Sequence, residues 1–315
     1  MNRSKYKTEP THRNSRRCIK HDYLAPSIYL ITANQYFGAP PMARIDEKAQ
    51  LNLTPLGEAI HREIYDINRH HPEIVVYQHV VMPDHIHIVL HVVKQLKRHL
   101  GQELAGFFGA CSRHWQRLEN LPHLQTLFQP FHDRILLRHN QLQTMKQYVA
   151  DNPKRLAIKR RYPDLFQRYS HIEINGMHFA AFGNIFLLRD FDRHQVVVHR
   201  ADSPQTRLNN YRTWIKCAAN GGVLVSPFIS PEEKKVYEHA EAVGGRFIII
   251  CKDGFPERFK PYGSQFELCA QGRLLLLAPW PDNLTRSKVT RWEAMEMNRM
   301  AAEIAAYTGP VSLKK

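Results

Sequence analysis

Residues 74–93 read IVVYQHVVMPDHIHIVLHVV, and this stretch decides the fold of the first half of the chain. Both of its halves are rich in β-branched side chains, which favour strands, and Pro83-Asp84 between them is a turn signal. Successive side chains of a strand point to opposite faces, so a hairpin is predicted with one apolar core face and one open face. The core face would hold Ile86, Ile88, Leu90 and Val92, and the open face His85, His87, Val89 and His91.

Further strands and helices surround this hairpin. Residues 28–33 are β-branched and aromatic, which favours a strand, and Thr54-Pro55 opens a segment with apolar residues at helical spacing up to His70. A helix over 100–118, a strand over 131–137 and a helix over 141–152 follow by the same criteria. The order predicts an α+β ferredoxin-like (β-α-β-β-α-β) domain followed by one helix.

The second half of the chain has a different pattern. Four apolar runs alternate with helical segments, and continuous apolar runs are typical of strands buried on both faces of a parallel sheet. A doubly wound α/β (Rossmann-like) domain is therefore predicted for residues 171–315, after a basic arm at 1–20 and the ferredoxin-like domain at 21–170. The four runs are residues 196–198, 223–225, 247–250 and 274–277.

The composition limits the partners and the compartment. The 315 residues carry a net charge of +15, mostly within residues 1–170, and a basic chain without a membrane segment most often binds a polyanion, above all nucleic acid. No apolar stretch approaches membrane-spanning length, and the basic amino terminus has no leader-like apolar run behind it. The five cysteines form no Cys-x-x-Cys pair, so a reducing cytoplasm is expected.

A second motif, Tyr148 to Pro153, gives the histidine pair a chemical context. With 19 histidines in the chain, about one His-x-His triplet is expected by chance, so His85 and His87 alone carry little weight. A phenol such as Tyr148 can attack phosphorus, and Asn152 lies one helical turn later on the same face. Two imidazoles and an amide oxygen form a neutral site for a divalent cation, here Mg²⁺ or Mn²⁺. Pro153 predicts that the helix ends at Asn152.

Four motifs in this order resemble those of the HUH single-tyrosine transposases of insertion sequences, in particular the REP-associated tyrosine transposases. The resemblance covers most of residues 13–170 and leaves the second domain unmatched. The motifs are Arg16-Arg17 with Asp22-Tyr23, Val80 to His87, Phe131 to Ile135, and Tyr148-Val149-x-x-Asn152-Pro153.

The resemblance implies a metal-dependent enzyme that cuts and rejoins single-stranded DNA beside hairpins. Tyr148 matches the nucleophile that forms a 5′-phosphotyrosine, and His85, His87 and Asn152 match the metal ligands. Asp84 stands where many relatives have Asn, and the third ligand is often Gln in the family. Candidate DNA-binding residues are Arg16, Arg17, Arg134, Lys154, Arg155, Lys159, Arg160 and Arg161.

Several alternatives stay open. The chain is either an active transposase or a domesticated hairpin-binding protein with little turnover, and binding of single-stranded RNA is a weaker alternative. The expected partner is single-stranded or hairpin DNA without a membrane, and a homodimer is open because Tyr148 could serve its own chain or a second copy. Residues 132–134 could orient ligands, hold a phosphate or form a strand-end ion pair. The ligand of the second domain is undetermined.

Overall fold

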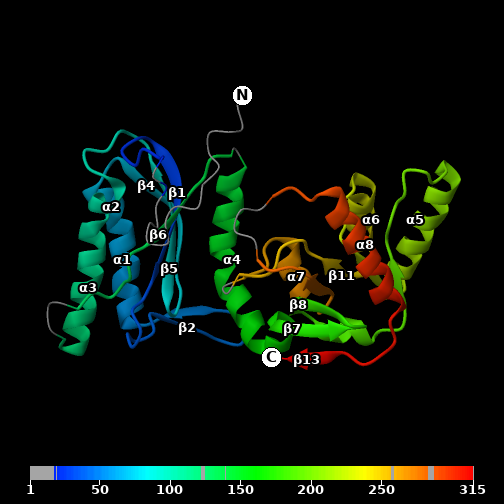
Figure 1. Ribbon diagram of the computed structural model, residues 1–315. Coiled ribbons are helices and arrows are strands. Elements are labelled where there is room, and N and C mark those ends of the chain that lie inside the picture. The colour runs from blue at the N-terminus through cyan, green and yellow to red at the C-terminus, as the bar shows by residue number, and fades with distance from the viewer. Residues whose placement is uncertain are drawn as a thin grey trace. The chain divides into compact units, whose positions relative to one another are not determined.

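The computed structural model describes residues 18, 20–121, 125–138, 140–256, 259–282 and 287–314 (Figure 1). The chain is a mixed α/β protein with several sheets. It divides into two compact units, one ending at Ile158 and the other beginning at Lys159. The boundary lies within helix α4 (Gln141–Arg161). Among the described residues, no helix combines the length and the apolar character that crossing a bilayer would require.

The sheet of the first unit is built around the predicted hairpin. Its strand order is β4-β5-β1-β6, and each neighbouring pair is antiparallel. A short pair of strands, β2 (Ala43–Ile45) and β3 (Leu51–Leu53), lies outside this sheet and was not predicted. The strands of the main sheet are β1 (Ser27–Asn34), β4 (Ile74–Val81), β5 (His85–Val92) and β6 (His132–Ile135).

One face of this sheet is covered by helices α1 (Pro55–His70) and α3 (Ala105–Glu119), with the short α2 (Leu100–Glu103) before α3 (Figure 1). The Thr54 side chain accepts the Gly57 N–H, which caps α1. The predicted core face of β5 is confirmed, because its apolar side chains pack in one buried cluster with those of α1 and α3. This cluster includes Ile31, Ile60, Ile64, Ile86, Ile88, Leu90, Val92, Cys111 and Trp115.

The opposite face of the sheet is not open, and that expectation was wrong. Helix α4 packs on it, burying Val149 completely against the strand residues Leu30, Val80 and Val89. The sequence shows apolar spacing within a helix but not the sheet face on which the helix rests. Covering this face removes apolar surface from water and brings the side chains of α4 to the histidines of β5.

Helix α4 also continues through Pro153, so the predicted end at Asn152 was wrong. A proline inside a helix leaves the carbonyl four residues earlier, that of Val149, without its usual backbone donor and costs about 3 kcal/mol. Val149 and Leu156 lie on either side of Pro153 and pack in the same apolar cluster, which offsets this cost. The basic residues after Pro153 consequently form the last two turns of a helix.

The second unit contains a larger sheet with the strand order β13-β7-β8-β12-β11-β10-β9. The four strands from β12 to β9 are parallel, as predicted from the apolar runs, and β13, β7 and β8 add an antiparallel part. The strands are β7 (Arg168–Ile174), β8 (Met177–Gly183), β9 (Arg193–Gln195), β10 (Val223–Ser226), β11 (Arg246–Ile250), β12 (Leu274–Ala278) and β13 (Ser312–Lys314).

Helices cover both faces of this sheet. One apolar cluster joins alternate strand residues to α5, α6 and α7, and another joins the remaining ones to α8. The strand predicted at residues 196–198 was wrong in position, because the observed strand β9 ends at Gln195. Val196, the first residue after β9, is buried. The helices are α5 (Pro204–Ala219), α6 (Pro231–Ala242), α7 (Ser264–Ala270) and α8 (Arg291–Ala306), with short 3-10 helices η1 (Pro163–Phe166) and η2 (Ile185–Arg189).

Gly183, at the end of β8, is expected to tolerate no side chain. Its φ is +109°, and a Cβ there would lie 2.5 Å from the carbonyl oxygen of Leu274. We expect Gly183→Ala to lower the free energy of unfolding of the second unit by about 2 to 4 kcal/mol, through strain and overpacking. Urea unfolding measures this loss. Gly176→Ala is the matched control, since φ there is +71° but no atom lies within 4 Å of the added Cβ; an equal loss in both variants would contradict the role of the close contact.

His79, on β4, is expected to make stability depend on pH. Partial burial, with repulsion from His61, lowers the pKa of His79 to about 4. The folded chain therefore keeps His79 neutral, whereas the unfolded chain protonates it below about pH 6.5. Stability should fall as the pH drops from about 6.5 to about 4, by about 1 to 2 kcal/mol because solvent still screens the ring. Urea titrations of wild type and His79→Gln test this, and identical pH profiles would contradict it.

Candidate active site

His85 and His87 lie next to each other on the face of β5 that α4 covers. Their ring centroids are 4.8 Å apart, with the rings nearly perpendicular. His87 is buried, with 6% of its surface exposed, whereas His85 is partly exposed. The alternation predicted from the sequence thus places both imidazoles side by side on the sheet face that α4 partly covers.

Each of the two rings is held at its Nδ1 atom by an oxygen. The Nδ1 of His87 lies 2.8 Å from the Oγ1 of Thr32, which the β1–β5 register places directly opposite. The Nδ1 of His85 lies 2.6 Å from the carboxylate of Asp84. Histidines that bind metals through Nε2 commonly donate Nδ1–H to such an oxygen, which fixes the ring orientation. The arrangement therefore suits metal binding through the Nε2 atoms.

Tyr148 reaches the same surface from α4. Its ring centroid lies 5.6 Å from that of His87, although 61 positions separate the two residues in the chain. The ring is half-buried and packs against the apolar cluster that contains Val149, and the guanidinium carbon of Arg155 lies 5.7 Å from its centroid. The Tyr148 hydroxyl makes no hydrogen bond with any other residue that the structure describes. A candidate nucleophile, two imidazole rings and the guanidinium group of Arg155 thus lie close together.

Asn152 follows Tyr148 by one turn of α4 but is not joined to the histidines. Its amide nitrogen donates to the backbone carbonyl of Tyr148 at 2.7 Å. Within the described part of the chain, no hydrogen bond links Asn152 to His85 or His87. The structure therefore brings His85, His87 and Tyr148 together and leaves Asn152 beside them on the same helix.

The candidate DNA-binding residues are distributed over both units. Arg16 and Arg17 lie outside the described residues. Arg155 stacks on Tyr148, and the ammonium of Lys159 lies 5.6 Å from the centroids of both Phe166 and Phe266 in the second unit. The side chains that are exposed to solvent are those of Arg134, Lys154, Arg160 and Arg161.

Asp133, on β6, belongs to a hydrogen-bonded network rather than to an exposed strand end. Its carboxylate accepts the hydroxyl proton of Tyr23 at 2.7 Å, and the same hydroxyl oxygen accepts the Cys18 N–H. Burial and the bond to Asp133 raise the pKa of Tyr23, so this tyrosine stays protonated. The structure thus shows the partly buried Asp133 as a hydrogen-bond acceptor for Tyr23, and the three alternatives for residues 132–134 stay predictions.

Thr32 is a site residue that sequence reasoning missed, because only the register between β1 and β5 brings it to His87. If the site works through His87, Thr32→Val should lower the rate of DNA cleavage by about 10- to 100-fold, by freeing the imidazole orientation. Thr32→Ser keeps the hydroxyl and should retain most of the rate. Single-turnover cleavage rates compare the variants, and equal rates in wild type and Thr32→Val would exclude this positioning role.

Comparison with solved structures yields distant likenesses. No family model matches the sequence, and no curated protein matches it. A REP-associated tyrosine transposase bound to a REP hairpin is similar over 43% of this chain and 72% of its own, with 14% identity and a TM-score of 0.31.

Two further solved structures are similar at the same level. DNA processing protein A from Helicobacter pylori, described for its single-stranded DNA binding mode, matches 41% of this chain and 57% of its own, with 15% identity and a TM-score of 0.29. A protein from Deinococcus radiodurans R1, described as a transposase, matches 42% of this chain and 94% of its own, with 15% identity and a TM-score of 0.25.

Proposed function

We propose that the first unit is a ferredoxin-like domain that cuts and rejoins single-stranded DNA at hairpins, as a transposase does. The motifs resembling the HUH single-tyrosine transposases support this proposal. So does the strand order β4-β5-β1-β6, in which α1 joins β1 to β4 and α3 lies between β5 and β6. The partner would be single-stranded or hairpin DNA in the cytoplasm, and the strongly basic composition suits it.

One observation carries the proposal: the ring of Tyr148 lies 5.6 Å from that of His87, which in turn neighbours His85. A tyrosine at an arbitrary position in a helix would not be expected to lie beside the His-x-His pair of β5. The sequence predicts a joint role for the two motifs, and the short distance between their rings supports it.

We propose that a divalent cation binds at these side chains, which is supported by the oxygen contacts at both histidine Nδ1 atoms. His85 and His87 would hold it through nitrogen, with Asn152 as the third ligand through its amide oxygen. These neutral ligands leave the charge of Mg²⁺ or Mn²⁺ available to stabilise the negative charge that develops on a phosphate during cleavage. Asp84 and Thr32, which contact the two Nδ1 atoms, would orient the rings.

The Tyr148 oxygen loses its proton to solvent water and attacks the phosphorus, forming a P–O bond while the bond from phosphorus to the 3′ oxygen breaks. The departing 3′ oxygen takes up a proton, and the 5′ phosphate remains on Tyr148. Attack by a 3′ hydroxyl on this phosphotyrosine reverses the step and rejoins the strand. Arg155, beside the tyrosine ring, would contact the phosphate.

For the second unit we propose a Rossmann-like fold, supported by its parallel strands with helices on both faces. Helix α6 begins with a capping box, in which Ser230 accepts the Glu233 N–H. This cap is structural, and no catalytic role is proposed for Ser230.

The test is a denaturing gel with end-labelled single-stranded hairpin DNA taken from the sequence beside the gene. We expect a covalent protein–DNA band that requires Mg²⁺ or Mn²⁺ and disappears with EDTA. Binding without an adduct, across several hairpins and both ions, would favour the domesticated hairpin-binding protein. Stronger binding of a matched RNA hairpin would count against a transposase.

A further inference from the structure

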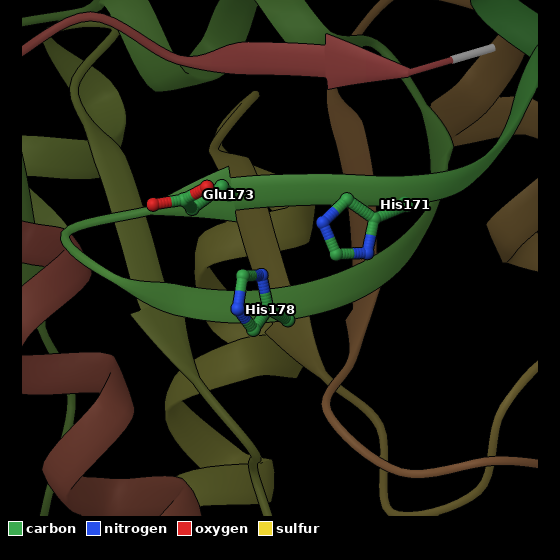
Figure 2. Close-up of side chains that lie close together, drawn as sticks. All are labelled: His171, Glu173 and His178. Atoms are coloured by element: carbon green, nitrogen blue, oxygen red, sulfur yellow. The ribbon is translucent and has the colours of Figure 1, made fainter.

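A second group of metal-ligating side chains lies in the other unit, on the hairpin of β7 and β8. His171 and Glu173 come from β7 and His178 from β8, and one ligand atom from each lies within 4.8 Å of those from the other two. The two imidazole rings are 4.7 Å apart between centroids. Figure 2 shows the rings side by side on neighbouring strands, with Glu173 nearer the turn.

The hairpin holds these side chains on one face by its register. Glu173 is the direct cross-strand partner of His178, and His171 lies two residues before Glu173 on the same side of β7. The turn between the strands is Asn175-Gly176, with φ of 50° and 71°, as a tight two-residue hairpin loop requires. A shift of the β7–β8 register by one residue would move the three ligand side chains apart. The turn residues fix this register and therefore the distances between the ligands.

The opposite face of the hairpin is anchored in the core. Ile172, Ile174 and Phe179 are buried in an apolar cluster of the second unit. The hairpin is also paired on both sides, β7 with β13 and β8 with β12. The three ligand side chains thus stand on a rigid support, which reduces the entropy lost when they close on an ion.

The donor atoms are available and close enough. None of the three side chains makes a hydrogen bond or ion pair with another residue that the structure describes, so no contact must break first. Zinc bonds of about 2.0 to 2.1 Å place tetrahedral donors about 3.4 Å apart. Glu173 and His178 are exposed and His171 is partly exposed, so their side chains can rotate. Such rotation can shorten the distances between the ligand atoms from up to 4.8 Å to those of a zinc site.

We propose that His171, Glu173 and His178 bind a divalent transition metal of the zinc type, with the fourth coordination position open to water. Two imidazoles and one carboxylate are ligands that zinc takes in proteins, whereas Mg²⁺ prefers oxygen ligands only. This site is separate from the one proposed at His85 and His87, and it does not depend on that proposal.

A second group, Asp192, His194 and Cys217, is the weaker candidate. The carboxylate of Asp192 is already 3.0 Å from the His194 imidazole, and burial raises the pKa of the Cys217 thiol to about 11. Metal binding there would require loss of a thiol proton in an apolar setting. This group supplies a matched control, because it offers a histidine in the same unit.

The experiment measures Zn²⁺ affinity by competition with a chromogenic chelator, using the full chain with His85→Gln and His87→Gln to remove the other site. We expect one Zn²⁺ per chain. His171→Gln or His178→Gln should weaken binding by at least about 10- to 100-fold, since even changes to groups behind the ligands cost that much. His194→Gln should leave the affinity unchanged. Circular dichroism checks that the replacements leave the fold intact.

Two outcomes would overturn the proposal. One is an affinity that stays the same in His171→Gln and His178→Gln. The other is a loss that appears in His194→Gln instead. Co²⁺ supplies a second measurement, because its visible absorption spectrum reports the ligands directly; a spectrum identical in the parent and in His178→Gln would equally exclude coordination by this histidine.

Discussion

Replacing Tyr148 by phenylalanine is expected to abolish the covalent protein–DNA adduct and to slow strand cleavage by on the order of 10⁴-fold or more. The change removes only the hydroxyl oxygen that would attack phosphorus. The ring remains in place beside His87 and in its apolar cluster. Because the hydroxyl makes no hydrogen bond with another described residue, stability should change little. Denaturing gels with labelled hairpin DNA measure the adduct, and urea unfolding measures the stability.

Tyr162→Phe is the control for this experiment, because Tyr162 is also partly exposed and lies beside Arg161, but it belongs to the second unit and not to the unit that holds His85 and His87. It should cleave like wild type. Hairpin binding should survive in both variants, since phosphate contacts depend on basic side chains. Undiminished cleavage by Tyr148→Phe would eliminate the tyrosine mechanism, whereas absence of cleavage in wild type as well would favour a binding protein.

The second large effect is expected at His87. His87→Gln removes a proposed ligand of the cation, and loss of several kcal/mol of transition-state stabilisation corresponds to a rate reduction on the order of 10³-fold. Because His87 is buried and bonded to Thr32, some loss of stability is also expected. Cleavage rates measured over a range of Mn²⁺ concentrations separate the two effects, since a weakened metal site should be partly rescued by excess Mn²⁺.

His91→Gln is the matched control, because His91 lies on the same face of β5 and bonds to Tyr77 rather than to the candidate site. It should cleave at the wild-type rate with an unchanged Mn²⁺ dependence. Equal losses in His87→Gln and His91→Gln would show that the strand, and not the site, is sensitive to histidine replacement.

The local sequence was sufficient for the elements whose patterns are strong. The alternation along β5 predicted which side chains enter the core, because the period of a strand is fixed by backbone geometry. Thr54 identified the start of α1, because capping depends on side chains within three residues of the helix start. The parallel strands β10, β11 and β12 were recognisable as continuous apolar runs for the same local reason.

Other features depended on contacts between distant parts of the chain. Pro153 predicts the end of a helix, yet α4 continues because Val149 and Leu156 pack on the sheet. The pairing of Thr32 with His87 follows from the register of β1 and β5. The group of His171, Glu173 and His178 was not singled out in the sequence, since its assembly requires the exact register of a hairpin.

By itself, the sequence determined the two motifs, the chemistry that their residues can perform and the faces on which they lie. Only the tertiary structure decided that α4 covers the histidine face of the sheet, that Tyr148 meets His87, and that Asn152 bonds to the carbonyl of Tyr148. The physical reason is that periodicity and capping are encoded by neighbouring residues. The choice of which surfaces pack together is made by burial of apolar area across the whole unit.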